Sequence, residues 1–151
     1  EGLYAVVVDR EIGSLLAAGQ RALTSGGTSH EMIARAALAL LGYVETSTDG
    51  FRILVRDSPV AQSTGGFASL ISDAASQVEH ILAAQFKARG FEARYAPMYA
   101  QMLVGMVALT GQWWLDVRKP KKSDVAAHLV NLAWNGLAGL EGKPRLGEGR
   151  R

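Results

Sequence analysis

The sequence predicts an all-α domain of about six helices. Apolar residues recur at steps of three and four in successive blocks of the chain, which is the period of an amphipathic helix. The composition agrees, because 48% of the 151 residues are hydrophobic, only 7% are aromatic and the chain holds 4 Pro. A chain of this length can enclose one core. We therefore expect one domain over residues 1–142 and a flexible tail over residues 143–151.

The first helix is expected over residues 1–24. The valines at 6–8 would suit a strand, but the longer period of three and four favours a helix. The stripe consists of Tyr4, Val8, Ile12, Leu15, Leu16, Gly19 and Leu23. The turn residues SGGT at 25–28 then end this helix.

The second helix is expected over residues 29–46, and its start carries a capping box. Thr28 stands three residues before Glu31, so each side chain can bond to a free backbone N–H of the first turn. The centre, ALALLGYV, is apolar on every side, which predicts a central and fully buried helix. A short apolar piece, FRILVRDSP, follows at 51–59, and Pro59 sets its boundary.

The next helix is expected over residues 67–89, where Gly90 and Phe91 predict a C-terminal cap. A further helix over residues 95–118 is apolar on two opposite faces, and Pro120 follows it. One face carries Tyr95, Met98, Tyr99, Met102, Met106, Leu109 and Trp113, and the other carries Leu103, Val104, Val107, Gly111 and Trp114. Ser123 is expected to cap a last helix, which is again apolar on two sides and continues to Gly142.

The second apolar faces of the last two helices predict self-association. Leaving them in water would cost on the order of 25 cal/mol per Å² of apolar area. The simplest partner is the same pair of helices from a second copy, which gives a homodimer with an intermolecular four-helix bundle. The expected interface residues are Leu103, Val107, Gly111, Trp114, Leu129, Leu132 and Gly136. The alternative is that both faces are core within one chain.

Several kinds of chemistry have no signal in the sequence. There is no Cys, and the three His residues fall on three different expected helices, so we expect neither a metal site nor any other cofactor. No nucleophile elbow or phosphate-binding loop is present, and we do not expect an enzyme. The net charge is only +2, without a broad basic face for nucleic acid. The longest apolar stretch, residues 102–115, is shorter than the ~20 residues of a bilayer span, so no membrane partner is expected.

Three strings give the chain a resemblance to a known family. They are EGLY at 1–4, GQWWLDVRKP at 111–120 and VNLAWNGLAGL at 130–140. Together with the order and lengths of the helices, they resemble the tetracycline-repressor (TetR) family of transcriptional regulators. EGLY is similar to the end of the motif that closes the helix-turn-helix domain of that family. The resemblance implies that residues 1–24 are the connecting helix and that a DNA-binding domain precedes them.

The resemblance also implies a function and a mechanism. In this family a small molecule binds inside the regulatory domain, and the short helix, here FRILVRD, moves the connecting helix. The two recognition helices of the dimer then no longer match major grooves about 34 Å apart, and repression is relieved. For this chain the resemblance implies a cytoplasmic, homodimeric regulator, more often a repressor, that reaches operator DNA through the preceding domain. Arg52 and Arg56, on the short helix, become candidates for coupling.

The family supplies no invariant pocket residue, so the effector site is inferred from inward-facing positions. The candidates are Phe51, Phe67, Ile71, Tyr99, Met102, Met106 and Trp113. Such a lining would suit an apolar or amphipathic molecule, with Tyr99 as a polar contact and the Met cluster as adaptable volume. The opposite assignment of the two faces of residues 95–118 stays open, and so does a purely structural role for these side chains. A helical protein-interaction module without a small-molecule ligand is the alternative function.

Overall fold

The computed structural model describes residues 2–24, 26–49, 52 and 67–147, and regular secondary structure within them is entirely helical. The all-α prediction is confirmed. The helices are α1 (Gly2–Thr24), α2 (Ser29–Thr46), α4 (Phe67–Ala88), α5 (Ala96–Val117) and α6 (Lys122–Ala138), with a 3-10 turn, η2 (Ala93–Tyr95), before α5. The short helix expected at 51–59 lies outside the described residues, apart from Arg52, which is helical.

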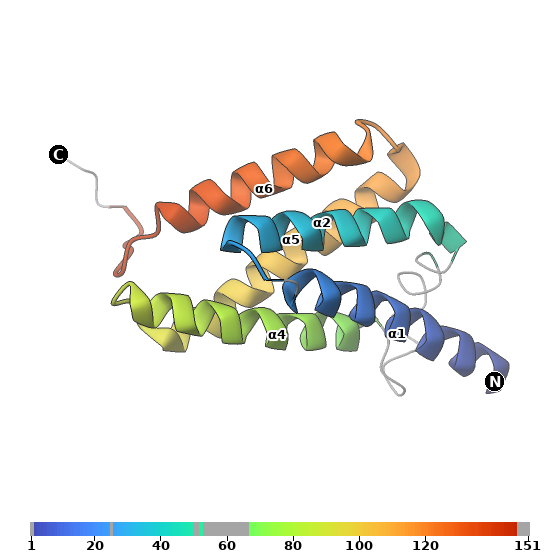
Figure 1. Ribbon diagram of the computed structural model, residues 1–151, viewed down its shortest axis with the longest axis horizontal. Coiled ribbons are helices and arrows are strands. Elements are labelled where there is room, and N and C mark those ends of the chain that lie inside the picture. The colour runs from blue at the N-terminus through green and yellow to red at the C-terminus, as the bar shows by residue number, and fades with distance from the viewer. Residues whose placement is uncertain (1, 25, 50–51, 53–66, 148–151) are drawn as a thin grey trace.

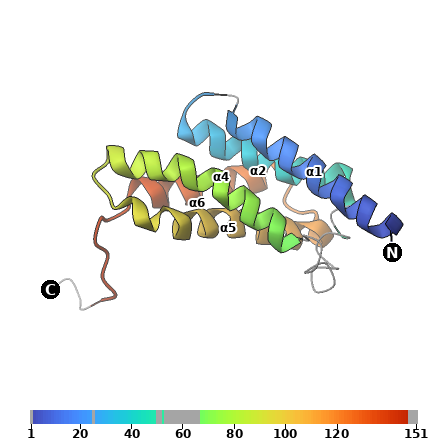
Figure 2. The ribbon, with the colours of Figure 1, turned by 90° about the horizontal axis from the view of Figure 1, so that it is seen from below.

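α2 lies at the centre of the arrangement. It packs between α1 and α6 and also contacts α5, while α4 and α5 form an antiparallel pair (Figure 1). Seen from below, α1 and α2 form one side of the molecule and α4 and α5 form the other (Figure 2). Ala37, Leu41 and Val44 of α2 are completely buried, as expected for a central helix. The expectation that α2 is buried all round is wrong, because Leu38 is 41% exposed.

The ends of two helices carry the caps that the sequence predicts. The Glu31 N–H donates to Thr28 Oγ1 at 3.2 Å and the Thr28 N–H donates to Glu31 Oε2 at 3.4 Å, which completes the capping box. At the end of α4, Gly90 has a φ of +74° and the Phe91 N–H donates to Phe86 O at 2.8 Å. This bond and the left-handed glycine form a Schellman motif.

The junction between α5 and α6 differs from the prediction. α5 ends at Val117 with Arg118 in the left-handed conformation, φ 57°. Lys121, not Ser123, stands at the cap position of α6, and its carbonyl accepts from the N–H groups of Asp124 and Val125. Ser123 lies inside the first turn of α6 with an exposed side chain, so its predicted capping role is wrong. α6 ends at Ala138, before the expected Gly142.

Most of the buried residues form two separate clusters. One joins α2 to the ends of α5 and α6 that meet at their junction, around Leu41, Val44 and Trp114. The other joins the C-terminal half of α4 to the start of α5, where Phe86 packs against Ala96 and Ala100. The alanines let these two helices approach closely, since they present little volume between the backbones. The space between the two clusters is the site described next.

Candidate ligand-binding cavity

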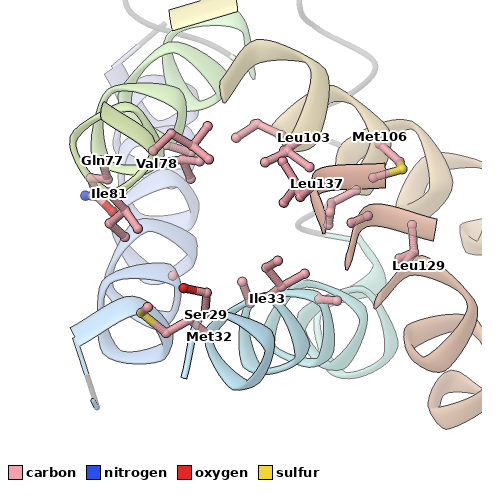
Figure 3. Close-up of a pocket in the computed structure, with 18 of the residues that line it drawn as sticks. Ser29, Met32, Ile33, Gln77, Val78, Ile81, Leu103, Met106, Leu129 and Leu137 are labelled. Carbon is pink, nitrogen blue, oxygen red and sulfur yellow. The ribbon is translucent and has the colours of Figure 1, made fainter. Parts of the chain in front are cut away.

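A cavity of about 470 Å³ lies between the helices, and all five of them contribute to its lining (Figure 3). α4 lines it from Ile71 to Phe86, and Arg89 follows just after the end of that helix. On the facing side, α5 and α6 contribute Leu103, Met106 and Leu129, among others (Figure 3). Trp134 of α6 also lines the cavity, and its indole meets the ring of His30 edge-on with 5.3 Å between centroids.

Helical spacing and small side chains explain why this space exists. The lining residues of α2 follow steps of three and four, so they occupy one face of that helix. They include Ser29, Met32, Ile33, Ala36 and Leu40. Alanine at several lining positions of α2 and α4 leaves volume that larger side chains would fill. A cavity with such a lining favours an apolar occupant over water.

The lining carries few polar groups. Apart from the indole of Trp134, these are Ser29, Gln77, Gln85 and Arg89. Arg89 is already engaged, because its two terminal nitrogens donate to Leu137 O at 2.8 Å and to Ala138 O at 3.3 Å. Its guanidinium also lies 4.6 Å above the ring centroid of Phe91. The cavity is therefore apolar with a few polar positions at its edge, which is the usual make-up of a small-molecule site.

α1 forms one wall of the cavity through Leu15 and Gly19. Two side-chain contacts fasten α1 to α2. Tyr43 donates a hydrogen bond to the Glu11 carboxylate, and Arg35 donates from Nε to Ala22 O at 3.1 Å. Burial, and then the hydrogen bond to Glu11, raise the pKa of Tyr43 above its ordinary value. Neither contact was foreseen, since a Tyr or Arg on a helix carries no signal of its partner.

Comparison with known proteins decides the family. Residues 29–136 match the family described as "Tetracyclin repressor-like, C-terminal domain". The chain belongs to this family. The expected resemblance is thereby confirmed, and the match spans α2 to α6, the helices that enclose most of the cavity.

One curated relative is the HTH-type transcriptional activator FasR of Mycolicibacterium smegmatis, which is 24% identical to this TetR-like chain over 138 residues. The aligned region covers 90% of this chain and 62% of FasR, so the chain spans less than two thirds of that relative. In the part that the structure describes, no helix combines the length and hydropathy needed to cross a membrane. Nor do three His, Asp or Glu side chains converge on a possible metal position among those residues.

The residues expected to bind the effector fall into four groups in this TetR-like domain. Ile71 and Met106 line the cavity. Tyr99 lies in the second core cluster, with its ring 5.4 Å from that of Phe86. Met102 and Trp113 are 54% and 53% exposed on the outer side of α5. The side chains of Phe51 and Phe67 lie outside the described part of the chain.

The residues expected at the dimer interface are found in the cavity lining, in the interior of the chain and at its surface. Leu103, Val107 and Leu129 line the cavity. Gly111 and Trp114 are buried within the chain and have almost no surface to offer a partner. Leu132 and Gly136 are exposed on α6. Cavity-lining residues thus come from both predicted faces of α5, Leu103 and Val107 from one and Met106 from the other, because both faces are apolar and periodicity cannot say which one turns inward.

Of the two coupling candidates, Arg52 forms an exposed ion pair with Asp116 at 3.1 Å, and Arg56 is not among the described residues. The same region holds a residue that sequence reasoning missed. Arg118 donates from Nη2 to Val44 O at 3.1 Å and to Thr48 Oγ1 at 2.6 Å. It lies in the loop RKPKK, and a basic residue in such a loop carries no sequence signal of a partner.

Proposed function

We propose that this chain is the effector-binding and dimerisation part of a cytoplasmic transcriptional regulator. The effector is a small apolar or amphipathic molecule that occupies the cavity between the five helices. The cavity itself carries the proposal: its volume of about 470 Å³ lies within the usual range for ligand pockets, and its lining is almost wholly apolar. Operator DNA is contacted by a helix-turn-helix domain that precedes this segment in the intact regulator.

The wall formed by α1 supplies a route from ligand to DNA. α1 is the connecting helix in this proposal, and it is held to α2 by the Tyr43–Glu11 contact and by Arg35. A ligand that prefers one position of α1 shifts the population toward it, by no more than its difference in affinity for the two positions. A ligand that favours the DNA-binding position activates the regulator, and one that disfavours it relieves binding. FasR is named an activator, and activation and repression are two outcomes of this same ligand-dependent shift.

A second copy of the chain is the proposed partner. The outer face of α5 exposes a stripe of large apolar side chains at helical spacing, and α6 exposes a leucine as well. These residues are Met98, Met102, Leu109, Trp113 and Leu132. An added Cβ at Gly105 or Gly136 would meet nothing within 4 Å, so two backbones can approach closely there. A two-fold pairing of α5 and α6 would bury this stripe in a four-helix bundle.

The same stripe supports the second candidate function, a module that binds a different protein. The two candidates differ in the state of the isolated chain. Sedimentation should show a dimer if the partner is a second copy. A monomer at micromolar concentration, together with failure to bind any apolar probe, would favour the interaction module.

The effector site can be tested by filling it. Ala74 of α4 lines the cavity, whereas Ala84 lies on an exposed side of the same helix and is absent from the lining. Ala74→Phe should abolish binding of the apolar dye Nile red, because the phenyl ring occupies the cavity, and Ala84→Phe should leave it unchanged. Circular dichroism would establish that both variants are folded. Undiminished dye binding by folded Ala74→Phe would contradict the proposal.

A further inference from the structure

The cavity meets solvent at one end of the domain. Most of its described lining residues are buried or half-buried, and four of them are exposed. These are Gln85 and Arg89 at the C-terminal end of α4, and Trp134 and Ala138 at the C-terminal end of α6. In each pair the two residues are one helical turn apart and share one face. A side chain that both lines the cavity and contacts water marks the place where the two meet, and we call this place the mouth.

In the opposite direction the cavity runs into the core. Leu15, Ala108 and Leu129 line it there, and all three are buried members of the first core cluster. On α6, Leu137 lies beside the mouth and Leu129 lies toward the core (Figure 3). Among the described residues, the mouth is therefore the place where the cavity can exchange its contents with solvent.

Arg89 bridges the two helix ends that form the mouth. Its Nη1 donates to Leu137 O at 2.8 Å and its Nη2 donates to Ala138 O at 3.3 Å, and both acceptors belong to residues of the lining. A guanidinium is favoured at this end of α6, because the last carbonyls carry the negative end of the helix dipole. The ring of Phe91, 4.6 Å from the guanidinium, favours the same position through a cation–π contact. The Arg89 side chain thus crosses the mouth from α4 to α6.

This bridge can open without any movement of the helices. α4 packs against α1 and α5, and α6 packs mainly against α2, so neither helix depends on Arg89 for its place. Leu137 and Leu140 also anchor the end of α6, because they pack against the second core cluster. Arg89 is exposed, so water competes for both of its hydrogen bonds. Rotation about its own side-chain bonds is enough to take the guanidinium away from the mouth.

We propose that Arg89 is a strap across the mouth, and that the effector enters and leaves the cavity while this strap is open. The inference rests on the proposed function, since it assumes that the cavity holds the effector. The two bonds of Arg89 go to backbone carbonyls of this chain, so the strap closes over an empty and an occupied cavity alike. Arg89 therefore sets how fast the regulator responds to a change in effector concentration, and not how tightly the effector binds.

Stopped-flow fluorescence with Nile red measures both rates. Arg89→Met keeps most of the length of the side chain and removes its donors. Association and dissociation should then each become about tenfold faster, the scale of one charge-assisted hydrogen bond. The Kd, which is the ratio of the two rate constants, should not change. Wild-type rates in the folded variant, or a change in dissociation alone, would overturn the inference.

A matched control removes a different cation at the same end of α4. Lys87 is an exposed residue in the last turn of α4 and is absent from the lining. Lys87→Met should therefore bind and release Nile red at the rates of the wild type. Equal acceleration in Lys87→Met and Arg89→Met would show that loss of charge, and not loss of the strap, changes the rates, and would also overturn the inference.

A bulky residue at the mouth should act in the opposite direction, and it keeps the test decisive if Arg89→Met does not fold. Gln85→Trp adds an indole at the mouth, so both rates should fall. Ala84→Trp, on an exposed side of the same helix and outside the lining, should leave them unchanged. Wild-type rates in folded Gln85→Trp would place the entrance elsewhere and contradict the inference.

The two proposals fail in different ways. If the strap is wrong but the cavity is right, Ala74→Phe abolishes binding of Nile red, while Arg89→Met and Gln85→Trp bind it at wild-type rates. If folded Ala74→Phe binds Nile red as the wild type does, the cavity is not the site, and the proposed function falls with the inference.

Discussion

At the scale of single residues, Arg118 joins more parts of the molecule than any other side chain described above. Its left-handed backbone ends α5, and its Nε donates to Leu115 O at 3.0 Å within that helix. Its Nη2 bonds to Val44 O and Thr48 Oγ1 at the end of α2. The guanidinium also lies 4.9 Å from the ring centroid of Trp114. One side chain therefore holds the C-terminal ends of α2 and α5 together.

Replacing this side chain should measurably destabilise the fold. In Arg118→Met the partly buried Val44 carbonyl loses its charged partner, and the free energy of unfolding should fall by about 1–3 kcal/mol. Urea unfolding followed by circular dichroism measures the change. Arg94→Met is the control, since Arg94 is exposed and pairs with its sequence neighbours Glu92 and Tyr95. Equal midpoints for the two variants would show that Arg118 does not join the helices.

Tyr43 gives the fold a dependence on alkaline pH. In the unfolded chain a tyrosine loses its proton near pH 10, whereas burial and the bond to Glu11 raise the pKa of Tyr43 in the folded state. The stability it contributes is complete below about pH 10 and declines as the pH rises above that value. Tyr43→Phe lacks this contribution. Its free energy of unfolding should therefore fall less steeply than that of the wild type between roughly pH 9 and 11, and parallel curves would count against the assignment.

At the scale of elements, the contribution of the C-terminal cap of α4 to stability can be measured separately from that of side-chain packing. Gly90 has a φ of +74° and an added Cβ there would meet nothing within 4 Å, so only backbone strain penalises a side chain. Gly90→Ala should cost about 1 kcal/mol. Gly42 lies inside α2 with equal space, and Gly42→Ala should stabilise by about 0.5–1 kcal/mol through helix propensity. Thermal unfolding of both variants tests whether the signs are opposite.

The outer stripe of α5 tests the proposed dimer. Trp113→Glu places a charge where a second copy would bury an indole, twice per dimer because of the two-fold axis, so dissociation should rise at least tenfold. Analytical ultracentrifugation would show the shift to monomer. Leu38→Glu on α2, which also replaces an exposed apolar residue, should leave the dimer intact. Dimers of equal strength in both variants would place the interface elsewhere.

The elements show what the sequence can predict. α2 has the predicted bounds and capping box, because period, cap and turn residues all act locally. The predicted cap of α6 was wrong. Ser123 is a good capping residue, but α5 ends at the left-handed Arg118 and the chain then places Lys121 at the cap position, so that Ser123 lies inside the first turn. The inward face of α5 was left open, since it depends on neighbours far away in the sequence.

At the scale of the whole molecule, the divided core predicts a response to ligand. Residues of both clusters line the cavity, and an apolar ligand would contact the two clusters at once. A ligand at 100 times its Kd stabilises the folded state by about 2.7 kcal/mol. The midpoint temperature of thermal unfolding should therefore rise by several degrees when Nile red or dodecan-1-ol is added, and the midpoint of Ala74→Phe should not rise. An unfolding midpoint of the wild type that stays unchanged at a saturating concentration of probe would contradict binding to the folded state.

The cavity itself could not be read from the sequence. Its lining includes Ala36 and Ala37 of α2 and Ala74 of α4, and alanine at an inward position looks the same whether a neighbour fills the space or leaves it open. Ile71 and Met106 were found because they carry large apolar side chains at inward positions. Ser29, Gln77 and Arg89 were not found, since polar side chains on helices are usually solvated.

α5 forms a wall of the cavity on one side, through Leu103 and Val107. On its other side, Met102 and Trp113 are exposed and belong to the proposed dimer interface. In the proposed dimer, α5 cannot tilt in response to its own ligand without moving the α5 helix of the second copy across the two-fold axis. Occupancy of one pocket would then alter the affinity of the other, and saturation of the dimer should depart from a simple hyperbola, with a Hill coefficient different from one.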